Sequence, residues 1–71
     1  MAYISFEPGE HMPENGLTPI WWWKEKEMNE FWTPNVPLWE FLMPYEIYML
    51  CIGESIDIDD KVVFENFTRT S

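Results

Sequence analysis

The sequence predicts an α+β fold, in which one principal helix packs on a small, mainly antiparallel sheet. Apolar residues between positions 19 and 32 gather on one arc at about 100° per residue, as in an amphipathic helix. Two runs rich in β-favouring residues, 55–58 and 62–67, flank the turn-forming residues 59–61 and indicate a C-terminal hairpin. Apolar residues make up 46% and aromatic residues 18% of the chain, so a core is expected despite the strong acidity.

The first half of the chain predicts a strand, a loop and the principal helix. Residues 2–6 (AYISF) have high strand preference, and residues 7–17 hold two prolines and two glycines, which favours a loop. Thr18 suits a helix N-cap and Pro19 suits the first helical position. The apolar residues on the inner arc of this helix are Ile20, Trp21, Met28, Phe31 and Trp32.

The stretch IWWWKEKE, residues 20–27, leaves two indoles without a place in this helix, because Trp22 and Trp23 fall among its polar residues. A strand would instead place Ile20 and Trp22 on one face and the other two tryptophans on the opposite face. The charges of KEKE give such a strand nothing to bury on either face. The helix is therefore preferred, and an all-helical first half with a single hairpin is the alternative fold.

The second half predicts a short helix followed by strands. Asn35 is expected to cap a helix over residues 36–43, which Pro44 ends. The apolar run YEIYMLCI at 45–52 suits a buried strand, although the proline before it and the glycine after it also permit a helix over the same residues. Residues 68–71 (TRTS) are expected to form a frayed tail.

Length and charge narrow the class of protein. The 71 residues predict a single domain spanning 1–71, and one cysteine cannot form an intramolecular disulfide. Four Lys and Arg against thirteen Asp and Glu give a net charge of −9, which repels nucleic acid and anionic membranes. The first residues lack the pattern of a secretory signal, so a cytoplasmic protein is expected, in the host cytoplasm if the chain is phage-encoded.

No motif predicts an enzyme, a cofactor or a metal site. Asp57 and Asp59 resemble the start of a calcium loop, but the pattern requires a glycine and an acid where Val62 and Thr68 stand. Solvated acids in a turn are the preferred interpretation, with a divalent-metal or ligand site on the Asp57–Asp60 turn as an alternative.

Thiol catalysis is not expected either. Cys51 lies in the apolar stretch YMLCIG, which predicts a packed thiol, and His11 lies in a loop rich in Pro, Gly and Glu.

Acidity combined with surplus aromatic residues favours a protein-binding role, because interfaces are enriched in aromatic residues and methionine. An exposed Trp22–Trp23 pair ringed by carboxylates would suit a basic partner surface with an apolar pocket. The predicted partner-binding residues are Trp22, Trp23, Glu25, Glu27, Glu30, Glu54, Asp57, Asp59 and Asp60. Self-burial of the indoles beneath the first strand or the long loop is the competing interpretation.

The expected function is that of a small inhibitor, which occupies a basic, nucleic-acid-binding surface of a larger enzyme or defence complex without binding nucleic acid itself. Carboxylates spaced like phosphates can mimic nucleic acid there. In size, acidity and lack of motifs, the chain resembles the small inhibitors that bacteriophages make against host defence or transcription enzymes. A structural or assembly module that buries its aromatic residues in a homodimer or a larger complex is the alternative.

Overall fold

The computed structural model describes residues 2–70, in which short strands and helices alternate. Along the chain they are β1 (Ala2–Phe6), β2 (Ile20–Lys24), β3 (Glu27–Pro34), the 3-10 turn η1 (Leu38–Glu40), α1 (Pro44–Cys51), β4 (Ile56–Ile58), α2 (Asp60–Asn66) and β5 (Phe67–Arg69). Within these residues the strands form a five-stranded sheet in the order β4-β1-β2-β3-β5, and every neighbouring pair is antiparallel. The α+β class with a small antiparallel sheet is therefore confirmed.

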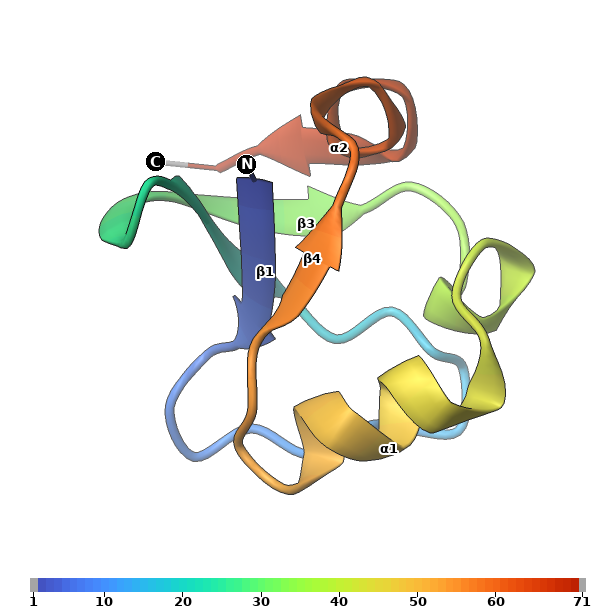
Figure 1. Cartoon of the computed structure of the whole chain (residues 1–71). Coiled ribbons are helices and arrows are strands. Elements are labelled where there is room, and N and C mark those ends of the chain that lie inside the picture. The colour runs from blue at the N-terminus through green and yellow to red at the C-terminus, as the bar shows by residue number, and fades with distance from the viewer. Residues whose placement is uncertain (1, 71) are drawn as a thin grey trace.

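The core lies on one face of this sheet. Alternate residues of β1 and β2 point into it and are buried, namely Ala2, Ile4, Phe6, Ile20 and Trp22. The three helical elements close the core with one fully buried residue each: Leu38 from η1, Leu50 from α1 and Val63 from α2. The two helices lie at opposite ends of the molecule, with α2 near the chain termini and α1 at the far end (Figure 1).

The predicted principal helix over residues 19–32 is wrong, because this segment forms the β2–β3 hairpin. Glu25 and Lys26 are its two-residue turn, and both have positive φ, 58° and 70°, as in the type I′ turns that match the twist of paired strands. The charges of KEKE therefore lie at a hairpin tip that faces water. Pairing of β2 with β1 and β3 supplies packing for large rings that a local helix could not provide.

Residues 45–52, predicted as a strand, form α1, which was the alternative interpretation. Pro44 occupies the first turn, and the Glu46 carboxylate accepts a hydrogen bond from the Met43 N–H at 2.8 Å. Gly53, with φ of 90°, lets the chain leave the helix at its C-terminal end. The helix predicted over residues 36–43 is reduced to the single 3-10 turn η1.

The run 62–67, predicted as the second strand of a C-terminal hairpin, is helical as far as Asn66. The carboxylate of Asp59 caps this helix by accepting a hydrogen bond from the Lys61 N–H at 2.8 Å. Phe64 of α2 packs against the indoles of Trp22 on β2 and Trp32 on β3. As a result β4 and β5 do not pair with each other: β4 pairs with β1, and β5 pairs with β3.

Residues 68 and 69, predicted to begin a frayed tail, belong to β5, and Thr70 is hydrogen-bonded to β3; Ser71 lies outside the described residues. The Thr68 hydroxyl donates a hydrogen bond to Asn35 Oδ1 at 2.7 Å, and the Thr70 N–H donates one to the Phe31 carbonyl at 2.9 Å. Asn35 therefore fastens β5 and does not cap a helix.

Candidate protein-binding surface

The face of the sheet opposite the core carries a second layer of aromatic side chains. Tyr3 and Trp23 are paired across β1 and β2, and their rings stack with centroids 5.7 Å apart and an interplanar angle of 24°. Trp21 and Phe31 are paired across β2 and β3, with centroids 5.1 Å apart. All four side chains are half-buried, and none belongs to the buried core cluster. We call these four residues the aromatic face.

The strand register places a methionine and a carboxylate at the two ends of the Tyr3–Trp23 row. Met28 of β3 pairs with Trp23, and Asp57 of β4 pairs with Tyr3, so one row crosses four strands. The side chain of Met28 is 57% exposed and Asp57 is exposed. Flat aromatic rings beside a flexible thioether are typical of a protein-binding surface.

Trp22 does not lie on this surface. It is 7% exposed and packs against Trp32 and Phe64, with ring centroids 5.9 Å and 5.5 Å away. The expectation that Trp22 is exposed among polar residues is therefore wrong, and self-burial holds for this indole. Trp23 is partly buried on the aromatic face, and its contact with a partner stays a prediction.

The three glutamates of the β2–β3 hairpin differ in what they can offer a partner. Glu25 and Glu27 are exposed at the hairpin tip. Glu30 instead accepts a hydrogen bond from Trp32 Nε1 at 2.7 Å and lies 3.5 Å from the guanidinium of Arg69, with its side chain only 23% exposed. Glu30 therefore links β3 to β5 within the fold. The sequence analysis predicted a contact of Glu30 with a partner and did not predict this structural role.

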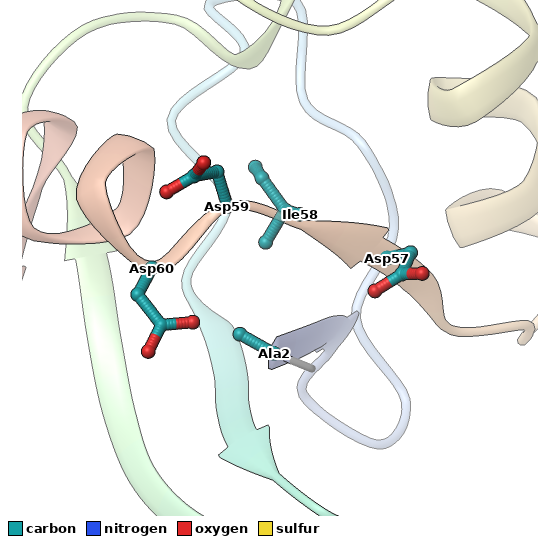
Figure 2. A pocket seen from close by; sticks show the side chains of 5 residues that line it. All are labelled: Ala2, Asp57, Ile58, Asp59 and Asp60. Atoms are coloured by element: carbon teal, nitrogen blue, oxygen red, sulfur yellow. The ribbon is translucent and has the colours of Figure 1, made fainter.

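The acidic turn after β4 lines a shallow hollow beside the start of β1, together with Ala2 and Ile58 (Figure 2). Its carboxylates point in different directions: Asp59 caps α2, Asp60 lies 3.6 Å from the ammonium of Lys24, and Asp57 belongs to the opposite face. Within residues 2–70 no three potential ligands come together to hold a metal ion. The carboxylates of this turn therefore do not converge on a point where they could bind a divalent metal ion together.

Glu54 lies in the connection between α1 and β4, whereas the other predicted carboxylates belong to the β2–β3 hairpin or to residues 57–60. Glu54 is exposed, and its contact with a partner stays a prediction.

His11 and Cys51 line a second hollow of about 510 Å³, which lies between the loop after β1 and the end of α1. Cys51 is exposed, contrary to the expected packing, because a helix and not a buried strand carries it.

Sequence reasoning missed four members of this surface, namely Tyr3, Trp21, Met28 and Phe31. The strand interpretation of IWWW, with Trp21 and Trp23 on the face opposite Ile20 and Trp22, was the signal that could have found them, and the burial of β2 follows this alternation. Phe31 and Met28 were instead assigned to the inner arc of a helix.

None of the helices in the described part of the chain has the length and apolar composition needed to cross a bilayer. Comparisons with family models, with curated proteins and with solved structures found no match. The surface chemistry of the chain is therefore the basis on which a function is proposed.

Proposed function

We propose that this protein is a non-enzymatic inhibitor, which occupies the basic surface that a larger nucleic-acid enzyme or complex uses to attract phosphate. The observation that supports this best is the aromatic face, in which four large rings stay only partly buried in a chain of net charge −9. A monomeric fold gains little from leaving such rings in contact with water, whereas a partner gains large contact area from them.

Trp23 and Tyr3 are the anchors of the proposed contact, and nearby carboxylates are its rim. The stacked pair offers a flat apolar platform on which an arginine guanidinium of the partner can lie. Asp57 stands at one end of this row, and Glu25 and Glu27 stand at the hairpin tip. Rim charges of this kind accelerate association, while buried aromatic anchors slow dissociation.

The net charge also determines how the inhibitor treats nucleic acid. A protein of charge −9 repels phosphates, so it competes with DNA or RNA for the partner without binding either. Salt screens the charged part of this attraction over about 8 Å at about 0.15 M ionic strength, so affinity for the partner falls as salt rises.

Affinity capture from a cell lysate tests the proposal, with the parent and Trp23→Ala as baits and the exposed loop variant Glu14→Gln as a matched control. The parent and the control should retain a basic nucleic-acid-binding protein that Trp23→Ala loses. Purified, this partner should release a labelled duplex when the parent is added. A parent that itself shifts the duplex at physiological salt, or a partner that keeps its duplex, contradicts the proposal.

A homo-oligomeric assembly module is the second candidate. Eight large hydrophobic side chains in the described residues are more than about a third exposed, which is a high number for so small a chain. Light scattering across a range of protein concentrations separates the two functions, since the inhibitor remains a monomer without its partner.

A further inference from the structure

Helix α1 carries an apolar stripe on its outer side. Tyr45 is 66% exposed, Tyr48 is 63% exposed and Ile52, which caps the helix, is 53% exposed. Their spacing of three and four residues puts them on one side of the helix. Met43, just before the helix, is 58% exposed and extends the same apolar end. We call Tyr45, Tyr48 and Ile52 the α1 stripe.

The fold does not need the α1 stripe. The opposite side of the helix attaches it to the core through Leu50, which is 1% exposed, with Ile47 and Met49 packed against the same cluster. A surface helix of a globular protein ordinarily presents polar residues on its outer side. An outer side with two tyrosines and an isoleucine therefore indicates a surface that something else covers.

The charge around α1 indicates what kind of surface that is. The segments 7–19 and 35–55, which include α1, η1 and the loop beside them, contain six glutamates and neither lysine nor arginine. The loop and the helix lie together, because both line the hollow that contains His11 and Ile52. The basic residues of the chain all lie in the β2–β3 hairpin, α2 and β5: Lys24, Lys26, Lys61 and Arg69. The end of the molecule that holds α1 is thus purely acidic.

We infer that α1 is a docking helix, whose stripe inserts into an apolar groove bordered by lysine or arginine on a partner protein. The spacing of the stripe is that of the anchors by which helices bind in grooves. A second copy of this chain does not fit, because its α1 end is purely acidic and its remaining residues carry seven acids against four bases, so neither end offers a basic border. The α1 stripe is separate from the aromatic face, so this inference stands whether or not the proposed inhibition holds.

Two synthetic amphipathic peptides test the chemistry of the site directly. One is built of leucine and lysine, and its counterpart is built of leucine and glutamate. Backbone amide NMR of the full chain, titrated with each, should show shifts concentrated at residues 43–52 for the lysine peptide. We expect the lysine peptide to bind about tenfold or more tightly than the glutamate peptide, with an affinity that falls with salt.

The double variant Tyr45→Ala and Tyr48→Ala should weaken binding of the lysine peptide by about tenfold or more, as loss of two interface anchors does. Because both tyrosines are largely exposed and alanine favours helix, its melting temperature should match that of the parent. Phe64→Leu, which removes a similarly exposed aromatic ring from α2 at the opposite end of the molecule, is the matched control and should bind like the parent. Shifts centred on Tyr3 and Trp23, equal binding of both peptides, unchanged binding by the double variant, or concentration-dependent shifts at 43–52 without peptide would each overturn the inference.

Discussion

Replacing Lys26 by glycine should stabilise this protein, although glycine usually weakens regular structure. Lys26 has φ of 70° at the tip of the β2–β3 hairpin, a left-handed conformation that costs an L-residue roughly 1–2 kcal/mol. Glycine adopts it freely but has about 0.5–1 kcal/mol more conformational freedom to lose on folding. The net gain in unfolding free energy should be about 0.5–1 kcal/mol.

Thermal unfolding followed by tryptophan fluorescence measures this gain. In a domain of this size, about 1 kcal/mol shifts the melting temperature by about 4–8 °C, so Lys26→Gly should melt a few degrees above the parent. Adding Glu25→Asn should raise it further, because Asn-Gly is the preferred sequence of a type I′ turn. Both positions are exposed, so neither change disturbs the core.

Glu27→Gly is the matched control, because Glu27 is the next residue along but belongs to β3. Glycine in a strand should lower the unfolding free energy by about 0.5–1 kcal/mol. The two neighbouring substitutions therefore have opposite signs if the hairpin is correct. In a helix both would be destabilising by about 1 kcal/mol. A Lys26→Gly protein that melts below the parent refutes the hairpin turn.

Three further predictions concern the tryptophans and the acidic residues. Trp22→Ala should cost about 3–5 kcal/mol, because it empties a packed core site, and thermal melts should show most or all of the protein unfolded at room temperature. Trp23→Ala should cost less than half of that and should instead lose about 2 kcal/mol of partner affinity, measured by calorimetry; equal melting temperatures for the two variants would contradict this. Asp59→Ala should lose about 1 kcal/mol with the α2 cap, whereas Asp57→Ala should leave chemical denaturation unchanged.

Some features could be predicted from short windows of the sequence, because their causes are local. The strand preference of the residues in AYISF correctly predicted β1, and the acidic composition is independent of the fold. Pro44 and Gly53 correctly bracketed a helix, although the apolar run between them was interpreted as a strand. That run is apolar on both sides of α1, so its periodicity could not separate a buried strand from a helix with an exposed stripe.

The site depended on information that no short window contains. Residues 20–32 satisfy the period of a helix and that of a strand, and pairing with β1, far back along the chain, decides between them. The turn carries no Asn-Gly signal, because strand pairing holds Glu25 and Lys26 in a conformation that their own preferences oppose. Trp22 is buried by Trp32 of the next strand and by Phe64 of α2, which lies more than half the chain away in sequence. Local sequence therefore set the charge, β1 and the ends of α1, whereas long-range pairing and packing decided which tryptophans face the core and which lie on the opposite face of the sheet.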